Sequence, residues 1–278
     1  MTADERLTLI RVKIERANKH IRDLEVELTA FKKEHPYTGS PKIYPQTGYS
    51  IYQADSVPDS LSIPALRDKI IPTTGDAIHN LRSALDHLAW QLSAVTGFVD
   101  VTGTPLTEKQ LREISFPIID TDDPAKYKTS RAGKVQAMRP SAVKLIDEIE
   151  PYKGGKGNGL WVLHKLDAIE KHRALLATLT DVKSIDFRVL NDKGKPTGFG
   201  YELKTFSLFG DHVPLKPALK AGDVLFIREG KANEDVQLVI EVTFSEPGII
   251  EGQPILPTLV QMANYIDTLI LSFRDELA

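Results

Sequence analysis

The sequence contains no cysteine, only two tryptophans and three methionines, and its formal net charge of −3 is small for 278 residues. The lack of cysteine excludes disulfides, thiolate nucleophiles and zinc sites with cysteine ligands. The nearly balanced charge gives no overall signal for nucleic acid, so any such binding needs a local basic patch. No apolar run reaches the roughly 18 residues that span a bilayer.

The first six residues include the charged Asp4, Glu5 and Arg6 and begin a helical pattern, whereas a signal peptide has an apolar core. Hydrophobic residues make up 41% of the chain, which is enough for a substantial core in one large domain or two smaller ones. We therefore expect a soluble, cytoplasmic protein without a membrane partner.

A heptad pattern predicts a long N-terminal helix. Thr2 and Glu5 have the spacing of a capping box, and apolar residues then recur at alternating steps of three and four. Such a narrow seam suits a bundle within the chain, which we favour, or pairing with a second copy. The seam comprises Leu7, Ile10, Ile14, Ala17, Ile21, Leu24, Leu28 and Phe31.

A second apolar stripe predicts a central helix over 73–97, with a kink or a fresh start at Pro72. Its residues are Ile78, Leu81, Leu85, Leu88, Leu92 and Val95. Further helical patterns cover 107–114, 141–149, 160–179 and the segment from Pro257, and an N-cap cluster lies at 120–124.

The pattern becomes alternating after Thr180 and predicts strands at 185–190, 201–209, 224–228 and 236–244. Short links between them favour an antiparallel meander. A hairpin is also expected at 42–44 and 49–52. The predicted fold is α+β: a helical bundle over 1–180 with an irregular insertion at about 98–137, a small antiparallel sheet over 181–250, and a C-terminal helix over 255–278 that returns to the bundle.

Two of the predicted helices share a polar pattern. When residues 78–87 are aligned with residues 163–172, both histidines and the leucine between them coincide. The charged positions also coincide, but their signs are opposite. Arg82 then faces Asp167, and Asp86 faces Lys171. These charges form either separate i, i+4 pairs on solvated faces or one crossed network in a cleft. The network around Arg82 would comprise His79, Asp86, His164, Asp167, Glu170, Lys171, His172 and Arg173.

Residues 82–87 read Arg-Ser-Ala-Leu-Asp-His, an arginine, a polar residue, three others and a histidine. This order resembles the signature of HEPN ribonuclease domains, which are helical bundles that usually dimerise to build one cleft. The resemblance implies a metal-independent endoribonuclease or RNA-binding protein that dimerises through its helices. His87 would then move the proton of the ribose 2′-hydroxyl or of the leaving group, and Arg82 would bind the phosphate. The strand-rich region after Thr180 departs from the all-helical plan of that family.

Five further segments, 75–87, 115–118, 150–152, 160–164 and 171–173, together resemble a family of uncharacterised bacterial cytoplasmic proteins from end to end. This resemblance implies that the chain is a complete unit of one bacterial family. It supports the architecture and implies no activity.

A metal site is an alternative, with His79, His87, His164 or His172 and with Asp86, Asp167 or Glu170 as ligands. Di-metal centres in bundles use Glu-x-x-His pairs, which neither helix has. The nearby Arg82, Lys171 and Arg173 would also repel a cation. We therefore expect neither a metal nor another cofactor.

A glycine-rich loop at 154–159 runs into a helix and is a candidate anion site, formed by Lys153, Gly155, Lys156 and Gly157. It lacks the Gly-Lys-Ser/Thr ending of a Walker loop, and a plain helix connection is the other interpretation.

The second functional class is a non-catalytic ligand-binding or scaffold protein whose polar helix flanks form a structural network. The ribonuclease requires Arg82 and His87 to be exposed together in a basic cleft, whereas the scaffold requires them to be paired and largely buried.

Overall fold

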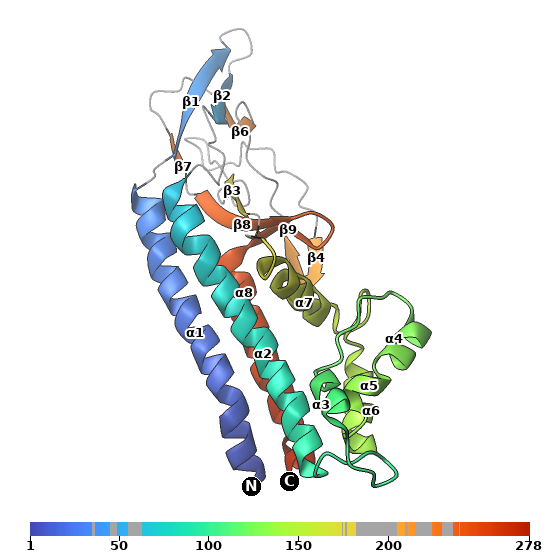
Figure 1. The fold of residues 1–278 in the computed structure, drawn as a ribbon. Helices are drawn as coiled ribbons and strands as arrows, with labels where there is room; N and C mark the ends of the chain where they lie inside the picture. The colour runs from blue at the N-terminus through green and yellow to red at the C-terminus, as the bar shows by residue number, and fades with distance from the viewer. Residues whose placement is uncertain are drawn as a thin grey trace.

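The computed structural model describes residues 1–34, 37–44, 49–54, 63–173, 175, 177–181, 205–208, 211–214, 224–229, 236–238 and 240–278. Its fold is α+β, as predicted. Three long helices lie side by side, and the two termini lie at the same end of this group (Figure 1). They are α1 (Ala3–Glu34), α2 (Ile71–Val95) and α8 (Ile255–Ser272).

Helix α1 begins with the predicted capping box. The Thr2 backbone N–H donates to Glu5 Oε2 over 2.7 Å, and the Glu5 backbone N–H donates to Thr2 Oγ1 over 3.2 Å. All eight seam residues are buried, and α1 packs against α2 and α8. The seam is therefore used within the chain, which agrees with the bundle interpretation.

Helix α2 follows a π-helical turn at Leu66–Ile70, and Pro72 lies in its first turn. The predicted break at Pro72 is thus a π turn that continues directly into α2. The chain leaves the helix through Gly97 and Phe98, which have φ angles of 74° and 59°. The predicted stripe is at most 1% exposed at Ile78, Leu81, Leu85, Leu88 and Leu92.

Short helices follow in the region expected to be irregular, and they lie beside the C-terminal half of α2 (Figure 1). A capping box at Thr107 starts the first of them, and Asp123 caps the second, as the two predicted N-terminal signals indicated. These helices are α3 (Glu108–Glu113), α4 (Pro124–Ser130) and α5 (Ala132–Val135), and α6 (Pro140–Ile149) follows them where a helix was predicted at 141–149.

Helix α7 (Asn158–Glu170) ends nine residues before the predicted end at Leu179, so the prediction was wrong there. Residues 177–179 belong to strand β3 (Ala177–Asp181), which pairs antiparallel with β8 (Ile240–Glu246). The β-branched Thr178 and Thr180 favour this extended conformation.

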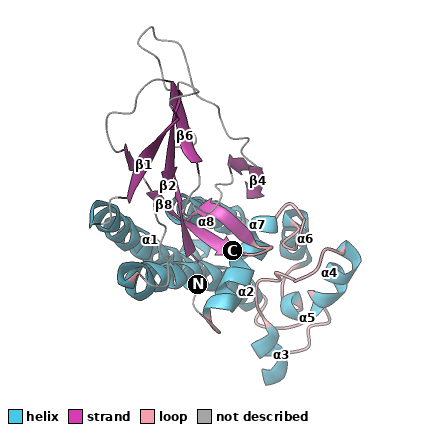
Figure 2. Cartoon of the chain, turned by 90° about the horizontal axis from the view of Figure 1, so that it is seen from above, coloured by secondary structure: helices cyan, strands magenta, loops and turns pink. Residues whose placement is uncertain are grey.

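The predicted hairpin is present as β1 (Tyr37–Tyr44) and β2 (Tyr49–Ala54). The strands gather to one side of the helices (Figure 2). The described strands form three antiparallel sheets with orders β6-β2-β1-β7, β3-β8-β9 and β4-β5. The remaining strands are β4 (Thr205–Leu208), β5 (Asp211–Pro214), β6 (Val224–Glu229), β7 (Val236–Leu238) and β9 (Ile250–Pro254).

The expected meander is corrected by this topology. Strands β6 and β7 pair with the hairpin β1–β2, so among the described strands after Thr180 only β4–β5 and β8–β9 are neighbours in both sequence and sheet. Alternating residues mark strands but do not specify which strands pair. The predicted strand at 185–190 lies outside the described residues. Within the described ranges, no helix is both long and apolar enough to cross a membrane.

Candidate functional site

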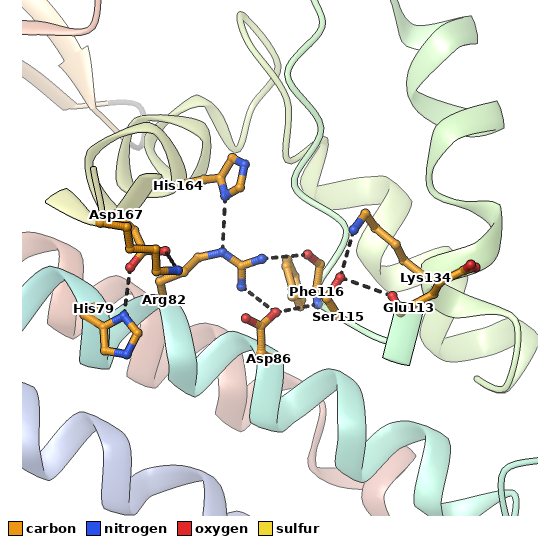
Figure 3. A network of polar contacts seen from close by, with 10 residues as sticks. His79, Arg82, Asp86, Glu113, Ser115, Phe116, Lys134, His164 and Asp167 are labelled. Atoms are coloured by element: carbon orange, nitrogen blue, oxygen red, sulfur yellow. Dashed lines mark hydrogen bonds and ion pairs between the residues drawn. The ribbon is translucent and has the colours of Figure 1, made fainter. Parts of the chain in front are cut away.

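Arg82 lies at the centre of a polar network between α2, α7 and the segment after α3 (Figure 3). Its Nη1 donates to Asp86 Oδ1 over 2.6 Å, its Nη2 to the Phe116 carbonyl over 3.3 Å, and its Nε to His164 Nδ1 over 3.5 Å. The residue is only 7% exposed. All three nitrogens of the guanidinium are therefore directed at acceptors of the same chain.

The Phe116 backbone joins this arginine pair to the segment after α3. The Phe116 N–H donates to Asp86 Oδ1 over 3.0 Å, while its carbonyl accepts from Arg82. Its ring is fully buried. Beside it, Lys134 Nζ donates to Ser115 Oγ over 2.9 Å. Arg82 and Asp86 thus hold segment 115–116 against α2. The sequence did not reveal this role, because every residue except proline carries both a backbone N–H and a C=O and the contacts at Phe116 use only these groups.

Asp167 on α7 is the buried acid of the network, with 3% exposure. It accepts from Lys171 Nζ over 2.6 Å, and its other oxygen lies 3.0 Å from His79 Nδ1 of α2. Both interpretations of the aligned helices are therefore correct in part. The local i, i+4 pairs Arg82–Asp86 and Asp167–Lys171 form, and the contacts His79–Asp167 and Arg82–His164 cross between the helices.

His164 is neutral near pH 7. Burial, followed by the positive charge of Arg82, lowers its pKa to about 4, while Asp167 and Asp86 oppose that shift. Because Arg82 Nε donates to Nδ1, the proton of the neutral ring must lie on Nε2. The imidazole therefore acts as an acceptor for the buried guanidinium.

Three other expected members lie outside the contacts of Arg82. Glu170 packs over Gly75 of α2, where an added Cβ would come 2.6 Å from Glu170 Cγ. Arg173 makes a bidentate pair with the buried Glu246 of β8, at 2.7 and 3.2 Å. His172 is exposed in the turn after α7.

His87 lies on a different face of α2 from Arg82. Five residues of α-helix place the two side chains about 140° apart around the axis. His87 is exposed, whereas Arg82 is buried, so α2 does not present them together. His87 instead lines a pocket of about 500 Å³ with Leu9, Asp86, Trp90, Gln91 and Ile114.

Asp86 connects the network to this pocket, because it contacts Arg82 and also forms part of the pocket wall. Sequence reasoning missed the pocket. A signal was present on α2, since Asp86 and Trp90, and likewise His87 and Gln91, are four residues apart on one side of the helix. Leu9 and Ile114 come from distant segments and gave no such signal.

The glycine-rich loop uses its own donors. Lys156 directs its backbone N–H and its Nζ at the Glu150 carboxylate, both over 3.2 Å, and the Gly157 N–H donates to the Glu150 carbonyl. These Lys156 bonds hold the pKa of Glu150 below its usual value. Lys153 Nζ lies 5.4 Å from the centre of the Trp161 ring. The chain's own carboxylate thus already contacts Lys156, one of the residues that were expected to bind an anion.

Close packing explains two of the loop glycines. A Cβ at Gly155 would lie 2.4 Å from the Glu150 carbonyl oxygen, and a Cβ at Gly157 would lie 2.8 Å from the Ile149 carbonyl oxygen. Both contacts are too short for a side-chain carbon, so the backbone of α6 would have to move.

We expect Gly157→Ala to lower the free energy of unfolding by about 1 kcal/mol, because the new methyl group overpacks the α6–α7 junction. Lys156→Ala is the control, since it removes only an exposed ion pair. Urea unfolding monitored by circular dichroism measures both. A larger loss for Lys156→Ala than for Gly157→Ala would show that charge, not packing, dominates in this loop.

No group of three or more histidine, aspartate or glutamate side chains that could hold a metal occurs among the described residues. In comparisons with known proteins, no family model, no curated protein and no solved structure matches the chain. The resemblances to HEPN domains and to a bacterial family therefore stay predictions.

Proposed function

We propose that this protein is a non-catalytic ligand-binding protein. The polar network of Arg82 fixes α2, α7 and the segment at Phe116 relative to one another, and the adjoining pocket takes the ligand. The observation that carries this proposal is that Arg82 is buried and directs every side-chain nitrogen at an acceptor of its own chain. A phosphate clamp must instead offer its donors to the substrate.

A HEPN-like, metal-independent ribonuclease or RNA-binding protein is the second candidate. The observation that favours it is that His87 is exposed in a pocket, where an imidazole is accessible for proton transfer. In this proposal the protein would form a homodimer that carries two such pockets and binds RNA. In this proposal Arg82 would have to leave Asp86 before it could bind a phosphate.

Cleavage of a mixed RNA pool in EDTA separates these proposals. We expect that neither the wild type nor His87→Ala cuts RNA, and that the two unfold at the same urea concentration because His87 is exposed on the surface of α2. Cleavage by the wild type that His87→Ala abolishes would establish the ribonuclease. His172→Ala removes a second exposed histidine and serves as the matched control.

A further inference from the structure

We propose that the pocket beside the network binds a planar nitrogen heterocycle with an amino N–H donor, such as the base of an aminopurine nucleoside. This inference rests on the proposed ligand-binding function and names the chemical class of the ligand. It combines an aromatic platform, two apolar walls and two polar atoms, Asp86 Oδ2 and Gln91 Nε2, that have no hydrogen-bond partner among the described residues.

Trp90 is the platform. Its side chain is 43% exposed, and its ring lies 4.7 Å from the Phe98 ring at an angle of 50°. The contact with Phe98 supports one part of the indole and restricts its rotation, while the pocket borders the ring. Leu9 and Ile114 supply apolar surface from two other segments. A flat ring gains stacking energy on such an indole, and the gain does not depend on a net charge.

Asp86 supplies the acceptor. Its Oδ1 accepts from Arg82 and from the Phe116 N–H, whereas its Oδ2 accepts no hydrogen bond from the described residues. The side chain is 40% exposed. A ligand N–H that points at Oδ2 would therefore give this oxygen a hydrogen-bond donor.

Gln91 also lines the pocket and supplies a donor. Its Oε1 accepts from Arg6 Nη1 over 2.8 Å, and since no described residue accepts from Nε2, the two hydrogens of Nε2 can reach a ligand acceptor. Base edges carry both donors and acceptors, and the pocket wall offers an acceptor from Asp86 and a donor from Gln91. Because Arg82 already balances the charge of Asp86, the pocket favours a neutral heterocycle over an organic cation.

The probe is adenosine, titrated against tryptophan fluorescence and by calorimetry. We expect saturable binding, and we expect N6,N6-dimethyladenosine to bind about tenfold more weakly because it lacks the amino N–H that Asp86 accepts. Trp90→Ala should weaken adenosine binding by about tenfold or more, and Trp90→Phe should restore most of it. Leu271→Ala truncates an exposed apolar residue of α8 outside the pocket and should bind as the wild type does.

Adenosine that binds Trp90→Ala as tightly as the wild type, or that fails to bind the wild type at millimolar concentration, would overturn the proposal. Circular dichroism of Trp90→Ala establishes that the variant is folded, and Trp90→Phe repeats the test with the ring retained. A free nucleoside and an unpaired RNA base share this chemistry. The same titration with an RNA oligonucleotide of five adenosine nucleotides shows whether the pocket binds the free nucleoside or the RNA base more tightly.

Failure of this inference and failure of the proposed function give different results. If adenosine does not bind but the amphipathic dye anilinonaphthalene sulfonate binds in a way that Trp90→Ala abolishes, the pocket binds ligands of another class. If the wild type cuts RNA and His87→Ala does not, the non-catalytic function is overturned, while the adenosine result still decides whether the pocket recognises a base.

Discussion

Arg82→Ala is expected to lower the free energy of unfolding by about 3 kcal/mol, the largest change among the variants considered. The substitution removes three donors at once. It leaves the Phe116 carbonyl without the Arg82 donor, His164 without the donor to Nδ1, and a void where the buried guanidinium lay. Urea unfolding of both proteins at pH 7 measures the difference.

Arg11→Ala is the matched control. Arg11 also makes a two-pronged ion pair, with both distances to Asp267 at 2.9 Å, but its side chain is 46% exposed. Such an exposed pair contributes less than about 1 kcal/mol. Arg82→Lys should recover only part of the loss, because one ammonium group cannot reach three separate acceptors. Equal losses for Arg82→Ala and Arg11→Ala would contradict a structural role for the network.

The helices were predictable because their signals are local. The seam of α1 and its capping box at Thr2 and Glu5 depend on spacings of three and four residues, and both are present as predicted. The pairing of β6 and β7 with the hairpin β1–β2 joins residues more than 170 positions apart. The alternation of apolar and polar residues within one strand does not specify which other strand it pairs with. Helix α7 likewise ends early because β8 pairs with residues that follow it.

The candidate site was predictable only where helix periodicity determines it. The aligned helices correctly indicated polar contacts between α2 and α7, but the contacts that cross are His79–Asp167 and Arg82–His164, not the expected Arg82–Asp167 and Asp86–Lys171. The six-residue motif suggested one joint site for Arg82 and His87, whereas the turn of the helix separates them by about 140°. The Phe116 backbone and the pocket wall at Leu9 and Ile114 depend on tertiary packing, so the sequence alone gave no signal for them.

His164 should make the protein less stable in mild acid. Its pKa is about 4 in the folded protein and near 6.5 in an unfolded chain. Between these two values the unfolded state binds a proton that the folded state does not. The free energy of unfolding is therefore highest above about pH 6.5, falls as the pH drops through this window, and levels off below about pH 4.

We expect this residue to remove about 2 kcal/mol of stability between pH 7 and pH 5. Protonation of Nδ1 would remove the acceptor of Arg82 Nε and place a second positive charge beside the guanidinium, with Lys134 adding to the repulsion.

His164→Gln keeps an acceptor and does not titrate, so its loss of stability between the two pH values should be smaller than that of the wild type by this amount. His87→Gln, which removes an exposed histidine outside the network, should lose as much as the wild type does. Urea unfolding of the three proteins at both pH values and constant ionic strength measures these differences. An equal loss for His164→Gln and the wild type would mean that the folded state tolerates a charged imidazole beside Arg82, and the network could not then depend on a neutral His164.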